Sequence, residues 1–109
     1  MGLLTVAEIS RAGTALTLVA ATSPSNWFPN TGRTYAHVRN GSASPITVTI
    51  DSVRRCDQGF DHDEIVSVPA GGDRLLGPFP PERFNNADGR VTISYSAVTT
   101  VTVGAFNLP

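Results

Sequence analysis

Three segments of the chain alternate between apolar and polar residues, the pattern of a β-strand with one buried face. In residues 46–51 every second residue is isoleucine or valine, and the residues between them are threonine or aspartate. Residues 91–96 and 101–105 repeat this alternation. We expect the apolar members of these segments to form the core: Ile46, Val48, Ile50, Val91, Ile93, Val101 and Val103.

The last two of these segments are separated by a short stretch at residues 97–99, so they are expected to pair as a C-terminal hairpin. Weaker strands are expected at residues 15–20, 34–39, 64–68 and 74–79. Seven or eight short strands, with no helix longer than a turn, are typical of a two-sheet sandwich or a small barrel. The pattern therefore predicts an all-β fold, an antiparallel two-sheet β-sandwich.

Residues that favour turns separate these segments, because glycine and asparagine accept a positive φ and proline fixes φ near −65°. Such clusters occur at residues 23–26, 29–32, 40–41, 70–72 and 88–89. The pair Gly71 and Gly72 is expected to close a hairpin. Two longer connections, residues 54–63 and 78–88, are of the length at which loops carry contacts or specificity.

Residues 1–12 carry four apolar side chains without a regular period: Leu3, Leu4, Val6 and Ile9. Two interpretations stay open, an arm that docks on a neighbouring chain and an ordinary edge strand. Residues 13–109 are expected to form one β-sandwich domain. The segment has no basic stretch before its apolar residues, so no signal peptide is expected.

Composition supports the all-β prediction, and the net charge argues against some classes of binding partner. Of the 109 residues, 28 are Val, Ile or Thr, and lysine is absent. β-Branched residues favour strands, and good helix formers are scarce. With eight Arg against nine acidic residues the net charge is −1, so we expect neither nucleic acid nor an anionic membrane as a partner.

The residues that could carry chemistry lack the necessary partners. Asp57, Asp61, His62, Asp63 and Glu64 form the densest acidic group, but their spacing does not fit a calcium-binding EF-hand loop. The only cysteine, Cys56, and the only other histidine, His37, have no neighbours suited to nucleophilic catalysis or metal binding. We therefore expect no enzyme activity, metal or cofactor. Cys56, His37 and His62 are expected to be dispensable for function.

Several apolar and cationic residues are candidates for a partner interface. Trp27 and Phe28 are expected either to form an exposed anchor for a sugar or a protein, or to belong to a loop folded over one end of the core. Buried apolar anchors surrounded by Arg–carboxylate contacts are typical of protein interfaces. The full set of interface candidates is Leu3, Leu4, Val6, Ile9, Trp27, Phe28, Arg33, Arg54, Arg55, Arg83 and Phe84.

A family resemblance rests on turn and strand motifs distributed over roughly residues 28–109. The motifs are Phe28-Pro29-Asn30-Thr31-Gly32-Arg33-Thr34-Tyr35, Val38-Arg39-Asn40-Gly41, Ile46-Thr47-Val48-Thr49-Ile50, Val68-Pro69-Ala70-Gly71-Gly72, Gly77-Pro78-Phe79-Pro80 and Gly89-Arg90-Val91-Thr92-Ile93-Ser94-Tyr95-Ser96. This pattern resembles the small β-sandwich proteins of tailed bacteriophages that are described as head decoration or minor capsid proteins. The resemblance implies a jelly-roll-like sandwich.

The same resemblance implies a structural virion protein, synthesised in the bacterial host cytoplasm and located on the outer capsid surface. It would bind the major capsid protein, cement adjacent capsomers and stabilise the capsid, as a homo-oligomer for which analogy favours a trimer. Two alternatives stay open. One is a glycan-binding or receptor-binding β-sandwich in which Trp27, Tyr35 and a loop carboxylate line a shallow site. The other is a tail or neck component of the virion.

Overall fold

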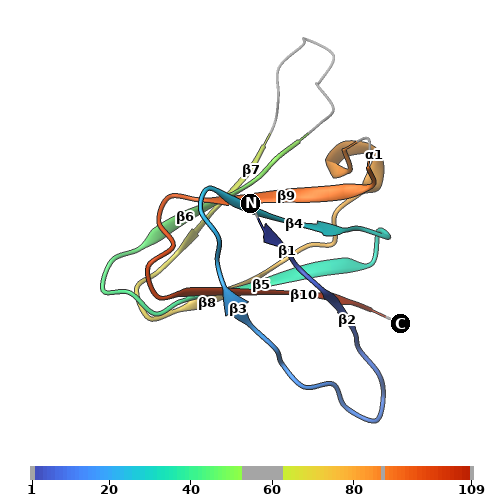
Figure 1. The fold of residues 1–109 in the computed structure, drawn as a ribbon, viewed down its shortest axis with the longest axis horizontal. Coiled ribbons are helices and arrows are strands. Elements are labelled where there is room, and N and C mark those ends of the chain that lie inside the picture. The colour runs from blue at the N-terminus through green and yellow to red at the C-terminus, as the bar shows by residue number, and fades with distance from the viewer. Residues whose placement is uncertain (1, 53–62, 87, 109) are drawn as a thin grey trace.

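The computed structural model describes residues 2–52, 63–86 and 88–108, which fold into two packed β-sheets (Figure 1). The first sheet has the strand order β1-β4-β9-β6-β7, and the second has the order β2-β10-β5-β8, with β3 also paired to β10. Strands make up 48% of the structure. The strands and the short helix are β1 (Gly2–Leu3), β2 (Val6–Glu8), β3 (Val19–Ala20), β4 (Ser25–Pro29), β5 (Thr34–Asn40), β6 (Ile46–Ile50), β7 (Glu64–Val68), β8 (Asp73–Leu76), α1 (Pro81–Phe84), β9 (Arg90–Tyr95) and β10 (Val101–Asn107).

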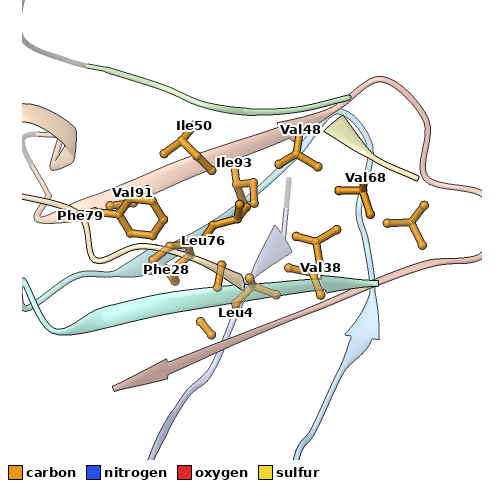
Figure 2. Packing of buried hydrophobic residues seen from close by; sticks show 14 of the residues in the cluster. Leu4, Phe28, Val38, Val48, Ile50, Val68, Leu76, Phe79, Val91 and Ile93 are labelled. Carbon is orange, nitrogen blue, oxygen red and sulfur yellow. The ribbon is translucent and has the colours of Figure 1, made fainter. Parts of the chain in front are cut away.

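The core lies between the two sheets, and the predicted core residues are confirmed. All seven have an exposed fraction of 3% or less. The second sheet contributes Val38 and Leu76 from the opposite side, and Figure 2 shows these apolar side chains meeting between the strands. Two aromatic residues fill one end of this layer, with the rings of Phe28 and Phe79 5.9 Å apart. The β-sandwich prediction is confirmed.

The expected C-terminal hairpin is wrong. β9 pairs with β4 and β6 in the first sheet, whereas β10 pairs with β5, β2 and β3 in the second. A tight turn, in which Val101 N–H donates to the carbonyl of Val98, brings the chain into the opposite sheet. An alternating strand has one apolar face whether its neighbour lies beside it or across the core, so the pattern alone does not distinguish the two arrangements.

The turn at Gly71 and Gly72 likewise joins two sheets and does not close a hairpin, because β7 pairs with β6 and β8 pairs with β5. Within the described ranges, β6 and β7 are the only consecutive strands that pair with each other. From β4 onward, each of the other connections between consecutive strands crosses from one sheet to the other. The fold is therefore held by pairings between strands distant in sequence.

Buried asparagines hold the corners at which the chain changes sheets. At the end of β5, the Asn40 amide nitrogen donates to the carbonyl of Ser44 at 2.8 Å and to the carbonyl of Val68 at 3.2 Å. It thereby joins the β5–β6 crossing to the end of β7. After β4, the Asn30 amide nitrogen donates to the Phe79 carbonyl at 2.9 Å and joins the β4–β5 crossing to the segment after β8.

The sheets are mixed and not purely antiparallel, because the N-terminal strands add in parallel. β1 pairs with β4, and β2 pairs with β10. Residues 2–8 thus occupy edge-strand positions in both sheets of their own chain. Two expected strands are shorter than predicted: residues 15–20 contribute only Val19–Ala20, and residues 74–79 contribute β8 before the chain turns away. In the described ranges, the one helix has four residues.

Candidate interaction surface around β8

β8 is a short edge strand of the second sheet, and one of its leucines faces outward. β8 pairs antiparallel with β5 and, among the residues that the structure describes, with no other strand. Because side chains alternate along a strand, Leu75 and Leu76 point to opposite faces. Leu76 is buried in the core, whereas Leu75 is 66% exposed. β8 therefore exposes a large apolar side chain to solvent on a backbone that is held in place by its pairing with β5.

Gly77 ends β8 where the chain passes very close to β5. Its φ is +131°, and a Cβ atom at this position would lie 2.9 Å from the Tyr35 Cβ and 3.1 Å from the Thr34 carbonyl oxygen. Only glycine fits this conformation and this approach without displacement. The close passage lets Phe79 enter the core and leaves Pro78 beside Leu75 on the surface.

An apolar hollow of about 300 Å³ adjoins Leu75. Tyr35 lies on its wall, and its ring is held by stacking on Phe106, with 5.5 Å between the centroids and 29° between the planes. Leu108, which is 48% exposed, also lines the hollow. The lining residues are Arg33, Tyr35, Leu75, Leu76, Gly77, Pro78 and Leu108. A hollow of this size accommodates one or two large side chains.

A charged hollow of about 310 Å³ lies on the other side of Leu75 and is lined by His37, Asp73, Arg74 and Leu75. The His37 Nε2 atom lies 2.6 Å from the Asp73 Oδ2 atom, and the Arg39 Nη2 atom lies 4.0 Å from the same oxygen. The hydrogen bond from His37 holds the pKa of the Asp73 carboxyl below its ordinary value, and the charges of Arg39 and Arg74 act in the same direction.

A third hollow, of about 230 Å³, lies between the edge strands β7 and β8. Its lining includes the buried Phe84, the half-buried Val66 and the exposed Glu64. Leu75 also lines this hollow. Three depressions thus meet at one exposed leucine. We call the residues around it the β8 surface: Arg33, Tyr35, His37, Asp73, Arg74, Leu75, Pro78 and Leu108.

The N-terminal interface candidates differ in where they lie. Leu4 is buried in the chain's own core, with an exposed fraction of 3%, whereas Leu3 is 56% exposed. Val6 and Ile9 are half-buried. Leu3 is therefore the candidate in this segment whose side chain is largely accessible to a partner.

Trp27 and Phe28 lie in strand β4, so the expected placement of this pair in a loop is wrong. Phe28 is fully buried in the core. Trp27 is half-buried on the other face, and the Arg90 guanidinium carbon lies 4.1 Å above its ring. The alternation of β4 separates the two side chains, and Arg90 covers one face of the ring that a sugar would use.

The remaining candidates are divided between the β8 surface, the core and the segment outside the described residues. Arg33 lines the apolar hollow. Phe84 is only 4% exposed, and Arg83 is half-buried with its guanidinium carbon 4.8 Å from the Phe84 ring. Sequence candidates that lie outside the described residues are Arg54, Arg55, Cys56, Asp57, Asp61 and His62.

Sequence reasoning missed the centre of this surface, Leu75, and its neighbour Leu108, and it placed Tyr35 only in the glycan-binding alternative. One signal was available in the adjacent leucines of β8. Two consecutive large apolar residues in an edge strand must face opposite sides, so one of them is exposed unless something covers it. The contributions of Tyr35 and Leu108 depend on pairings between β5, β8 and β10, which no local pattern encodes.

The described residues bring no three His, Cys, Asp or Glu side chains close enough to hold a metal ion. Asp63, one member of the predicted acidic group, accepts a hydrogen bond from the backbone N–H of Ser52 at 2.8 Å and so closes the base of the β6–β7 connection. Within residues 2–52, 63–86 and 88–108, no helix is long and apolar enough to cross a membrane.

Comparisons of the chain with protein-family models, with curated proteins and with solved structures give no match.

Proposed function

We propose that this chain is a structural protein of a tailed-bacteriophage virion that binds the outer capsid surface and joins adjacent capsomers. The observation that carries the proposal is the β8 surface, where an exposed leucine on a paired strand is flanked by an apolar hollow and a charged one. Apolar residues gathered in this way on a rigid element favour contact with another protein.

The position of the family-like motifs supports this proposal. Residues 68–72 immediately precede β8, and residues 77–80 immediately follow it. The motif at residues 28–35 supplies Arg33 and Tyr35 to the apolar hollow. The segments that resemble head decoration and minor capsid proteins therefore frame the β8 surface, which supports this surface as the one that contacts the capsid.

The chemistry of the surface defines what the partner must offer. The apolar hollow accepts an aliphatic or aromatic side chain, and the arginines near the charged hollow, Arg39 and Arg74, favour a carboxylate on the partner. Exposed ion pairs contribute little to the free energy of binding. The apolar contact at Leu75 therefore supplies most of the affinity of one site. Several copies on one particle then raise the overall affinity through avidity.

The test compares two equally exposed residues in edge strands of opposite sheets. Leu75 and Ile65 are both 66% exposed. Leu75→Thr and Ile65→Thr therefore remove similar apolar area, but only the first alters the β8 surface. Removal of a central apolar contact costs about 2 kcal/mol, or about a 30-fold loss of affinity for one site.

Binding is measured by co-sedimentation with undecorated capsids assembled from the major capsid protein of the same genome, and particle melting is recorded with and without the chain. The wild-type chain and Ile65→Thr should bind and raise the melting temperature, and Leu75→Thr should bind more weakly. If the wild-type chain binds no capsid, the decoration function is wrong. If Leu75→Thr binds as tightly as Ile65→Thr, the β8 surface is the wrong interface.

A further inference from the structure

The N-terminal residues 2–8, here called the arm, connect the two sheets by short parallel pairings. β1 pairs with β4 at two residues, and β2 pairs with β10 at three. Further hydrogen bonds run from the Leu4 N–H to the Trp27 carbonyl at 2.9 Å and from the Asn107 amide nitrogen to the Glu8 carboxylate at 2.8 Å. All of these contacts are made to the edges of β4 and β10, so a second arm could form them equally well.

Most of the connection from the arm to the body is exposed. Each of residues 10–16 is exposed, and the hydrogen bonds in this segment are local, such as the one from the Gly13 N–H to the Ser10 carbonyl at 3.1 Å. Figure 1 shows this segment as a loop that extends away from both sheets. Seven extended residues span about 23 Å, enough to carry the arm to an adjacent molecule.

The arm does not fill the groove in which it lies. A hollow of about 270 Å³ remains between it and the second sheet. The arm contributes Leu3 and Leu4 to the walls, and the body contributes Val19 and the Val103–Ala105 stretch of β10. Because atoms that line a void lose dispersion contacts on that side, an arm bordered by a hollow is held less firmly than the central strands.

We propose that the arm exchanges between copies of this chain, so that residues 2–8 of one molecule pair with β4 and β10 of another. Exchange re-forms every arm contact and needs only a change in the exposed connection, which makes it a low-cost route to an oligomer. It also brings apolar side chains of the arm and the connection next to a second body, since Leu3 is 56% and Leu16 is 55% exposed. This inference concerns the chain alone and does not depend on capsid binding.

A pair of cysteines across the arm contact distinguishes exchange from a closed monomer. Glu8 and Asn107 are register partners on β2 and β10 with touching side chains. In a Cys56→Ser background, the double variant Glu8→Cys with Asn107→Cys is unfolded, refolded at high concentration and oxidised. The matched control carries Thr47→Cys with Ser67→Cys, register partners on β6 and β7 that lie outside the arm.

Exchange predicts that most of the linked arm variant migrates as two or more chains on a non-reducing gel, whereas the control links within one chain. Mixing the two single variants, Glu8→Cys and Asn107→Cys, should give a disulfide between them. A second measurement, light scattering of the unmodified chain refolded at high and at low concentration, should show more oligomer at high concentration. Intrachain links alone in the arm variant, together with a monomeric mass at both concentrations, would overturn the proposal.

Discussion

The imidazole of His37 on β5 lies 2.6 Å from the carboxylate of Asp73 on β8 and so joins the edge strand to the centre of its sheet. The bond crosses the β5–β8 pair on the outer face, and both of its residues line the same hollow as the exposed Leu75. Because β8 has its other edge unpaired among the described residues, this bond adds a side-chain contact to the single pairing that holds the strand.

The first prediction is a loss of stability in acid that depends on Asp73. The folded-state pKa of this carboxyl lies below its ordinary value of 3.8, because His37 donates to the ionised form. The contribution of Asp73 is therefore present above pH 3.8 and is lost as the pH falls through the lower, folded-state pKa. The free energy of unfolding, measured with urea between pH 2 and 6, should fall less steeply in Asp73→Asn.

The exposed turn residue Asp88 provides the control for this measurement. Asp88→Asn should leave the pH dependence close to that of the unchanged chain. Equal acid slopes in the unchanged chain and Asp73→Asn would show that the His37–Asp73 bond does not contribute to the pH dependence.

The second prediction concerns Tyr95, whose hydroxyl donates to the Asn26 side-chain oxygen at 2.8 Å. Burial raises the pKa of Tyr95 far above its ordinary value of 10.0. A raised folded-state pKa means that stability is fully present below pH 10 and is lost as the pH rises above it, by up to about 1.4 kcal/mol per pH unit.

Tyr95→Phe should cost about 1 kcal/mol at neutral pH, the net value of one hydrogen bond, and should flatten the loss above pH 10. The Thr22 N–H continues to donate to Asn26, which limits the cost. Urea unfolding at pH 7 and at several values above pH 9 measures both effects. An alkaline slope unchanged by Tyr95→Phe would assign that loss to other groups.

The third prediction concerns the corner held by Asn40. Its side chain is fully buried, and its amide nitrogen donates to the carbonyls of Ser44 and Val68. Asn40→Ala removes these donors, and each buried polar group left without a partner costs about 1–3 kcal/mol. We expect the free energy of unfolding to fall by about 2–3 kcal/mol, as measured by chemical denaturation.

Asn86→Ala is the matched substitution for this corner, because the Asn86 side chain also forms hydrogen bonds with the backbone, accepting from the N–H groups of Asp88 and Arg90, but is exposed. It should cost less than about 1 kcal/mol, since water replaces the lost contacts. Similar losses of stability for the two variants would mean that Asn40 does not act as a buried link between the β5–β6 crossing and the end of β7.

The strand pattern was sufficient to predict the fold class and the core, because burial on one face imposes a period of two. Ile46, Val48 and Ile50 show this directly, since all three are buried. The pairing partners could not be predicted, because β9 and β10 carry similar patterns and lie in different sheets. The parallel addition of β1 and β2 was also beyond local reasoning, since two or three residues are too few to show a period.

The interface candidates show the same limit at the level of single residues. Phe28 and Phe84 are interface candidates by sequence, but tertiary packing buries both in the core. Leu75 was overlooked because an apolar residue in a strand is expected to face inward. Exposure depends on which face of β8 meets the core, and that follows from the pairing of Leu76 with Ala36.

The fourth prediction tests the chain passage that positions the β8 surface. Gly77 and Gly71 both have a positive φ, at 131° and 69°, but their surroundings differ. A Cβ atom at Gly71 meets nothing within 4 Å, so Gly71→Ala should cost only the backbone strain of about 1 kcal/mol. A Cβ atom at Gly77 would lie 2.9 Å from the Tyr35 Cβ, which sits on a paired strand and cannot move away easily.

Gly77→Ala should therefore destabilise the chain by more than Gly71→Ala, at about 2–4 kcal/mol, because strain and overpacking add. It should also displace Pro78 and Tyr35 from the apolar hollow and weaken capsid binding even under conditions where the variant is folded. Chemical denaturation gives the stability difference, and co-sedimentation gives the binding difference. Equal stability of the two variants would show that the close approach of Gly77 to β5 does not constrain the β8 surface.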